Sequence, residues 1–241
     1  MIDLRPLTEE NLSDGQRFFL KLYAAYRSII NPKRKENGLE KRRRKMNEER
    51  LAPLKAELDQ FLRNFPAVKL NLGCGDVVMP GWINIDRRDD VPNIDINYDL
   101  SQPLPFRDDT VDFIFNEHFL EHLSPAEGLV FLKECKRCLK PGGVLRVAMP
   151  HIKPVVDRYY NNDVESDWAR QMGVQTKAEL VNIGFKYWGH QWLYDEAELE
   201  RRLKEAGFEK IEHKPINQST YPELRNLETR IGSELIYEAV K

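Results

Sequence analysis

At 241 residues and 41% hydrophobic composition, the chain can bury one domain core plus an appendage, and its net charge of −2 gives no overall attraction to nucleic acid or membranes. Its apolar runs are shorter than the ~20 residues that span a bilayer, and early acidic residues do not fit a signal peptide. Three cysteines are too few for a disulfide framework, so we expect a cytoplasmic protein with reduced thiols and no transmembrane segment.

Residues 1–65 are predicted to form a helical extension. A capping pattern at Ser13–Gln16 precedes apolar residues at helical spacing, and a second apolar helical stripe runs from Leu51 to Phe65. Glutamates interrupt the basic run 33–45 between them, so we expect a solvated connector rather than a surface for RNA or anionic membranes. The helices could cover a ligand pocket or pair two subunits as a homodimer.

Residues 66–241 are predicted to form one α/β domain, because short apolar runs alternate with helical patterns. The first expected strands are VKLNLG (68–73), WINID (82–86), VDFIFN (111–116) and VLRVAMP (144–150), with a helix over 125–139. Asp195 could cap a later helix that stops at Gly207, and two final strands are expected at 207–213 and 234–240. This alternation predicts a doubly wound, mostly parallel sheet.

The segment 151–193 is less regular and rich in aromatic residues. Its rings could stack on an acceptor such as a sugar or pack beneath a lid. We interpret it as a substrate-side insertion in which most individual rings are structural.

A glycine-rich turn follows the first expected strand. In LNLGCGD, Gly73 and Gly75 would let backbone approach a ligand without an intervening Cβ. In an open parallel sheet, the carboxyl ends of the strands are where ligands bind. A Gly-x-Gly pair alone is weak evidence, since many tight strand-to-helix turns contain one.

Two acidic residues strengthen this interpretation. Asp86 closes the next expected strand, where a carboxylate can accept hydrogen bonds from ribose hydroxyls. Asp99, followed by Leu100, could accept from an adenine amino group, although ordinary turn chemistry is an equal alternative.

These motifs occur in the order found in a known family. LNLGCGD, NID, the run DL…LPFRDDTVDFIF and LKPGGVLRVAMP resemble the ordered motifs of class I S-adenosylmethionine-dependent methyltransferases. Elements G-W-I-N-I-D and E-H-x-x-E-H are similar to a small bacterial group often associated with glycan and surface-polysaccharide biosynthesis. The resemblance covers residues 66–150 well and implies a Rossmann-like, seven-stranded sheet.

The resemblance also implies site residues. The glycine-rich loop, with Leu72, Gly73, Cys74 and Gly75, would hold the methionine part of S-adenosylmethionine, and Asp86 its ribose. Asp99 and Leu100 would frame adenine, and Asn116, Glu117 and His118 would face donor and acceptor. One departure is the short connection from Asp76 to Ile85, because a parallel crossover usually needs about a dozen residues or more. The helix usual at this point must be reduced to a turn or so.

Methyl transfer to a hydroxyl needs more than a bound donor. The donor sulfonium is already activated, so alignment in a dry pocket supplies much of the catalysis, but the hydroxyl proton must be removed. Histidine is the natural base. His118 and His151 follow expected strands and His190 lies in the aromatic segment, so these three are the leading candidates. His122 is weighed beside them, and for each of the four the alternative is a histidine that orders a loop or hydrogen-bonds a carbonyl.

Neither of two further motifs is predicted to bind a metal ion. Glu117-His118 and Glu121-His122 repeat at a spacing of four, but they lack the H-E-x-x-H order of zinc proteases, so we expect no metal site. The C-x-x-C of Cys135 and Cys138 lies at core spacing in an expected helix, so its thiols are expected to be buried apolar groups.

The sequence therefore predicts a methyltransferase that transfers a methyl group by in-line displacement to an oxygen of a sugar, glycan or other small molecule. The alternatives are a non-catalytic S-adenosylmethionine-binding module and an RNA methyltransferase. A nicotinamide-dependent oxidoreductase is disfavoured, because Val78 occupies the position of the third small residue in G-x-G-x-x-G.

Overall fold

A computed structural model describes residues 52–53, 55–63 and 65–241. The first expected helix, the basic run 33–45 and any pairing of subunits through this region lie outside the described residues. Residues 55–62 are helical, as the sequence predicts. Their Leu58 and Leu62 are buried against the main core.

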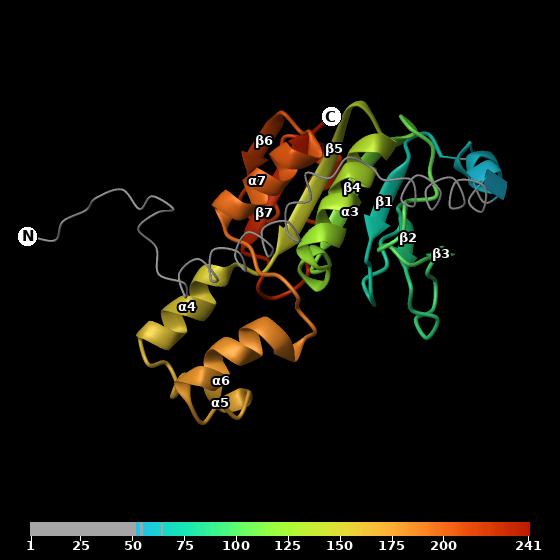
Figure 1. Cartoon of the computed structure of the whole chain (residues 1–241). Helices are drawn as coiled ribbons and strands as arrows, with labels where there is room; N and C mark the ends of the chain where they lie inside the picture. Colours follow the sequence, from blue (N-terminus) through green and yellow to red (C-terminus); the bar gives the residue numbers. More distant parts are fainter. Residues whose placement is uncertain (1–51, 54, 64) are drawn as a thin grey trace, which may run out of the picture. The chain divides into compact units, whose positions relative to one another are not determined.

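Seven strands form one sheet in the order β3-β2-β1-β4-β5-β7-β6 (Figure 1). They are β1 (Lys69–Leu72), β2 (Ile83–Asp86), β3 (Ile96–Asn97), β4 (Val111–Glu117), β5 (Leu139–Met149), β6 (Lys210–His213) and β7 (Leu235–Val240). β7 runs antiparallel to both of its neighbours, while the pairs from β3 to β5 are parallel. The predicted Rossmann-like, mostly parallel sheet is confirmed, and the two-residue strand β3 is an addition that the sequence did not predict.

The crossover from β1 to β2 contains no helix, in agreement with its shortness in the sequence. Two buried asparagines hold it instead: the Asn71 side chain donates to the Asn84 side chain at 3.0 Å and to the carbonyl of Val77 at 2.9 Å. The Asn84 side-chain oxygen also accepts from the backbone N–H of Met79 at 2.8 Å. Side-chain hydrogen bonds here replace the backbone ladder that a helix would have provided.

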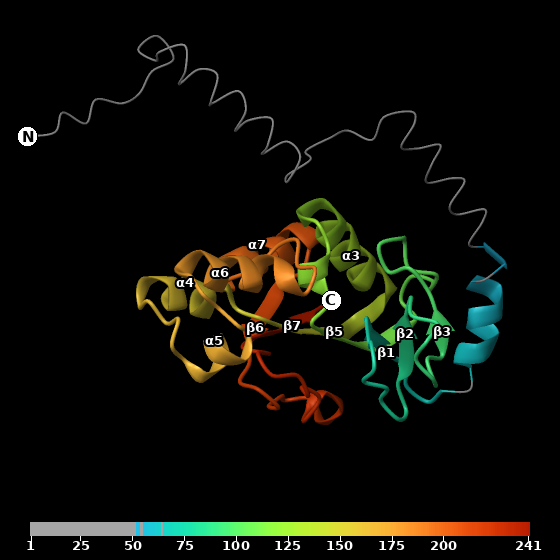
Figure 2. The same ribbon diagram turned by 90° about the horizontal axis from the view of Figure 1, so that it is seen from below.

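One face of the sheet carries the large core and the long helices (Figure 2). These helices are α3 (Pro125–Cys138), preceded by the 3-10 turn η2 (Leu120–His122), and α7 (Glu196–Ala206). Asp195 caps α7 through its side chain, and Gly207 ends it in the left-handed region, as predicted. None of the described helices is long and apolar enough to cross a membrane.

The opposite face is covered differently from a fully doubly wound sheet. Among the described residues, its small core is closed by Trp82 of the β1–β2 crossover and Leu224 of the long connection 214–234. That connection contains one short 3-10 helix, η4 (Pro222–Leu224), and no α-helix. Loop segments therefore cover this face, and their own side chains must fix them.

Between β5 and α7 lies a group of short helices at one end of the sheet (Figure 1). They are α4 (Ile152–Tyr160), α5 (Asp167–Gln171), α6 (Lys177–Asn182) and the π-helical turn η3 (Ile183–Tyr187). A small core of its own, built on Ala169, Val174 and Leu180, packs this group. The aromatic segment thus folds largely on itself.

The two cysteines of the C-x-x-C motif are fully buried in α3, as predicted. Cys135 and Cys138 are free thiols with no exposed surface. Burial raises the pKa of Cys138 to about 12 and that of Cys135 well above its usual value. Both thiols act as small apolar core groups.

Candidate active site

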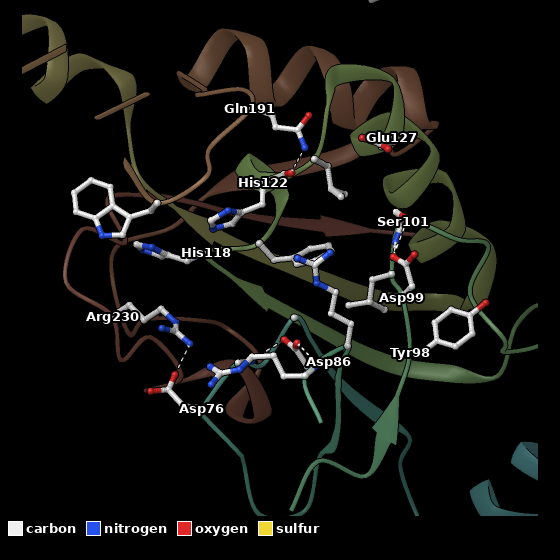
Figure 3. A pocket seen from close by; sticks show the side chains of 18 residues that line it. Asp76, Asp86, Tyr98, Asp99, Ser101, His118, His122, Glu127, Gln191 and Arg230 are labelled. Atoms are coloured by element: carbon white, nitrogen blue, oxygen red, sulfur yellow. Dashed lines mark hydrogen bonds and ion pairs between the residues drawn. The ribbon is translucent and has the colours of Figure 1, made fainter. Parts of the chain in front are cut away.

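A cavity of about 690 Å³ opens at the carboxyl ends of β1, β2 and β4 (Figure 3). This volume is in the range of small-molecule sites. The lining residues are Gly73, Gly75, Asp76, Asp86, Arg87, Arg88, Tyr98, Asp99, Leu100, Ser101, His118, Phe119, His122, Leu123, Glu127, Trp188, Gln191 and Arg230. Most of these side chains are polar or charged, so the cavity suits a polar ligand.

The glycine-rich turn after β1 forms one wall of the cavity. Gly73 and Gly75 have φ values of +72° and +55°, which favour glycine. A Cβ on Gly73 would lie 2.6 Å from the ring of Phe119, which is too close for a side chain. The ring therefore packs directly against the glycine backbone. Leu72 is fully buried and Cys74 is 3% exposed, and neither lines the cavity.

Asp86 lies at the end of β2 and lines the same cavity. One carboxylate oxygen accepts from the backbone N–H of Gly75 at 2.9 Å, and the other from the backbone N–H of Arg88 at 3.0 Å. A carboxylate oxygen can accept more than one hydrogen bond, so both retain capacity for a ligand. Asp86 therefore ties the glycine turn to β2 and presents its charge to the cavity.

Asp99 and Leu100 follow β3, and both line the cavity. One Asp99 oxygen accepts from the backbone N–H and the hydroxyl of Ser101, at 3.0 and 2.7 Å. This is the ordinary turn chemistry that was the alternative interpretation. Asp99 therefore both stabilises a turn and lines the cavity.

Two of the implied donor residues at the end of β4 lie behind the cavity wall. Asn116 is fully buried and donates to the carbonyl of Leu72 at 2.9 Å, which clamps β4 to β1. Glu117 is 4% exposed and accepts hydrogen bonds from a distant segment, at the backbone N–H of Thr229 and Arg230 and the hydroxyl of Ser233. Both residues lie at the end of β4 beside the site, but their side chains stabilise neighbouring segments and do not line the cavity.

The connection 214–234 is fixed by a second buried network. Arg146 of β5 has no exposed surface and pairs with Glu228 at 2.6 Å and with Glu238 of β7 at 2.7 Å. Two carboxylates on one guanidinium satisfy charges that would be costly to bury alone. Glu117 and Arg146 together hold this connection against the sheet.

Arg230 reaches from that connection to the glycine turn. Its guanidinium donates to the carbonyl of Cys74 at 3.3 Å and pairs with Asp76 at 3.0 Å, and its side chain is 31% exposed. The guanidinium also lies 2.9 Å from where a Cβ on Gly75 would be. The cavity thus has a cation beside its glycine turn. The neighbouring Arg225 instead donates to backbone carbonyls of its own loop.

His118 is the one predicted catalytic histidine that lines the cavity. It occupies the left-handed region, with φ of +51°, and its buried Nε2 has no hydrogen-bond partner among the described residues. Burial, with a smaller contribution from the charge of Arg230, lowers the pKa of His118 to about 4. Positive φ is rare for a residue other than glycine, and such strain is concentrated at functional sites.

The structure does not bring His151 and His190 to the cavity lining. His151 caps α4 and lies 2.9 Å from Glu196. His190 is 6% exposed, and its Nδ1 lies 2.9 Å from the carbonyl of Gly184. His190 is nevertheless close to the site, because its ring meets the ring of His122 edge to face at 5.0 Å between centroids.

Several lining residues were not among the predicted site residues. His122, weighed as a possible base but not chosen, follows His118 by four, and Trp188 and Gln191 come from the end of the aromatic segment. Gln191 donates its side chain to the carbonyl of His122 and its backbone N–H to that of Glu121, at 2.6 and 2.8 Å. The aromatic composition of 151–193 could have indicated Trp188, whereas no local signal indicates Gln191.

Among comparisons with known proteins, the match to a family model indicates the enzyme class. A family model described as a methyltransferase domain matches residues 78–147, and no curated protein matches the chain in sequence. Among solved structures, a SAM-dependent methyltransferase from Archaeoglobus fulgidus is 16% identical, with a TM-score of 0.43 over 81% of this chain and 98% of its own. One from Thermotoga maritima, titled a possible histamine N-methyltransferase, is 17% identical, with a TM-score of 0.44 over 93% and 97%. The strand order is that of the class I α/β methyltransferase fold, and the family match indicates a methyltransferase with S-adenosylmethionine as its cofactor.

Proposed function

We propose that S-adenosylmethionine lies in the cavity with its methionine part at the glycine turn. Gly73 and Gly75 allow backbone to approach the ligand, and the Arg230 guanidinium beside them suits the donor's carboxylate. Asp86 would accept from the ribose hydroxyls, and Asp99 with Leu100 would frame adenine. The assigned residues follow three neighbouring strands, β1, β2 and β3, so they form a row along which an extended donor can bind.

The acceptor would enter on the side formed by His118, His122 and Trp188. These residues line the same cavity as the glycine turn, so an acceptor there would face the donor's methyl group. Trp188 is about half exposed, and its ring offers a flat apolar face beside polar groups. A sugar or a similar polyhydroxylated small molecule combines the same two surfaces, which favours O-methylation of such an acceptor.

His118 is the proposed general base. The observation that carries this proposal is that its ring and the donor-side residues Gly73 and Asp86 line one cavity. Its Nε2 is buried and has no partner among the described residues, so it would take the hydroxyl proton of an acceptor that reaches it from the cavity. The methyl group would pass from sulfur to oxygen in line while the proton passes to the imidazole.

The test is methyl transfer from labelled S-adenosylmethionine to a panel of free sugars, nucleotide sugars, amines and RNA. We expect label on a hydroxyl of a sugar or similar small molecule. We also expect His118→Gln to reduce kcat by about 10²–10⁴-fold while KM for the donor stays within a few-fold. Label on an amine or on RNA would overturn the acceptor assignment, and donor binding without any turnover would instead support a non-catalytic binding module.

A matched histidine control is available. His151 caps a helix away from the cavity, so His151→Asn should preserve the cap and leave turnover near wild type. If His118→Gln and His151→Asn behave alike, His118 is not the base.

A further inference from the structure

A buried carboxylate without a partner lies behind the cavity wall. The side chain of Glu121 has no exposed surface, and neither carboxylate oxygen has a hydrogen-bond partner among the described residues. A buried carboxylate is normally paired or bound to a metal ion, because an isolated one is costly.

Two imidazoles lie close to this carboxylate. His118 Nδ1 lies 3.8 Å from the Glu121 Oε1, and His190 Nε2 lies 4.0 Å from the same oxygen. These distances are too long for hydrogen bonds. The Glu121 carboxylate therefore has no hydrogen-bond partner among the described residues.

His190 is held as a metal-binding histidine is usually held. Its Nδ1 lies 2.9 Å from the carbonyl of Gly184, and only a protonated Nδ1 can donate to that oxygen. In the neutral ring, Nε2 then carries a lone pair, and this atom faces Glu121. A ligating histidine almost always donates its other N–H to a carbonyl or carboxylate in this way.

One ligand atom each from Glu121, His122 and His190 lie within 4.8 Å of one another. Zinc binds imidazole nitrogen and carboxylate oxygen at ~2.0–2.2 Å, so ligand atoms around one ion lie about 3.3–3.5 Å apart in a tetrahedron. Small side-chain rotations would bring the three atoms to that spacing. Two histidines with one carboxylate form a ligand set that leaves a further coordination position open.

We propose that Glu121, His122 and His190 bind a divalent transition-metal ion, with Zn²⁺ the best match to their chemistry. His122 also lines the cavity, so the ion would lie at the boundary between the buried cluster and the ligand cavity. This proposal departs from the sequence-based expectation of no metal site. The E-H-x-x-E-H pattern contributes only Glu121 and His122, and the third ligand comes from the aromatic segment.

The experiment titrates Zn²⁺ into the full chain after treatment with a chelator, without donor or acceptor, and follows binding by calorimetry against a competing chelator. We expect one ion per chain. Glu121→Gln and His190→Asn should each weaken binding by more than about 100-fold, since even second-shell losses cost ~10–100-fold. His213→Asn is the matched control, because His213 is an exposed histidine of β6 outside the cluster, and it should bind as wild type does.

A spectrum of the unmodified protein keeps the test decisive if a variant fails to fold. Co²⁺ in the site should give visible d–d bands of a nitrogen and oxygen ligand set, without the thiolate charge-transfer band that cysteine ligation would produce. Absence of stoichiometric binding, a thiolate band, or equal binding by wild type and both cluster variants would each contradict the site. None of these results depends on the acceptor or on methyl transfer.

Discussion

The carboxylate of Glu117 accepts a hydrogen bond at 3.1 Å from the backbone N–H of Arg230, a residue 113 positions later in the chain. The last residue of β4 therefore sets the position of a guanidinium that lies beside the glycine turn. The resemblance to known methyltransferases assigned Glu117 to ligand contact. In the structure, its side chain acts on the cavity through Arg230.

Glu117→Gln should lower both stability and donor affinity. The glutamine side chain would place an N–H₂ group against the donors of Thr229, Arg230 and Ser233, which now bind the carboxylate. A buried polar group left without a partner costs about 1–3 kcal/mol. Urea unfolding followed by circular dichroism measures the first effect, and calorimetry with S-adenosylhomocysteine the second. Glu234→Gln, an exposed change in the same connection, should alter neither. Unchanged donor affinity in Glu117→Gln would show that Arg230 is positioned by other contacts.

Arg230→Gln should weaken binding of S-adenosylhomocysteine by about 10–100-fold, the equivalent of one charge-assisted hydrogen bond of ~1.5–3 kcal/mol. Binding of 5′-methylthioadenosine should stay within a few-fold, because that molecule lacks the amino-acid carboxylate. Calorimetry with the two ligands separates a carboxylate contact from a general loss of the site. Arg225→Gln, five residues earlier, serves as the control, and equal losses for both ligands would refute the assigned contact.

Gly73→Ala should destabilise the protein more than Gly81→Ala does. Both residues have positive φ, +72° and +76°, and an L-residue pays about 1–2 kcal/mol there. A Cβ on Gly81 meets nothing within 4 Å, whereas one on Gly73 meets the Phe119 ring at 2.6 Å. Overpacking adds roughly 1–3 kcal/mol at Gly73. The difference between the two urea midpoints measures the clash alone, and equal midpoints would mean that Phe119 moves without cost.

Arg146→Met should destabilise the fold by about 3–5 kcal/mol, because it leaves buried Glu228 without its cation and buried Glu238 with only Lys214, at 3.8 Å. The triple change Arg146→Met, Glu228→Gln and Glu238→Gln should recover a large part of that loss. Thermal unfolding of the two variants makes the comparison. A single variant as stable as wild type would contradict the account of this network.

The meeting of Gly73, Gly75 and Asp86 at one cavity was largely predictable from sequence, because the signals for it are local. A strand that ends in glycines and a strand that ends in Asp86 place their residues at one sheet edge by the geometry of parallel strands alone. The absent crossover helix was predictable in the same way, from the length of a single segment. The two-residue strand β3 was missed because so short a run carries no periodicity.

The remaining residues depend on contacts between distant segments. Nothing in the sequence near His190 indicates that its ring lies beside His122, 68 positions earlier in the numbering. Likewise, His151 follows a strand as His118 does, but a helix begins directly after it and uses the imidazole as a cap. The local sequence determines which strand end a residue follows, whereas the direction of its side chain depends on the residues that pack against it.

The buried pairing of Arg146 with Glu228 has a consequence for how the protein can be divided. The recognisable motifs end near residue 147, yet the strand that carries Arg146 needs a carboxylate from residue 228 and another from residue 238. A fragment limited to the motif-bearing segment would expose an unmatched guanidinium on a central strand and lose the cover over one sheet face. The smallest autonomous folding unit is therefore much longer than the stretch by which the enzyme class is recognised, and its final strand is as necessary as its first.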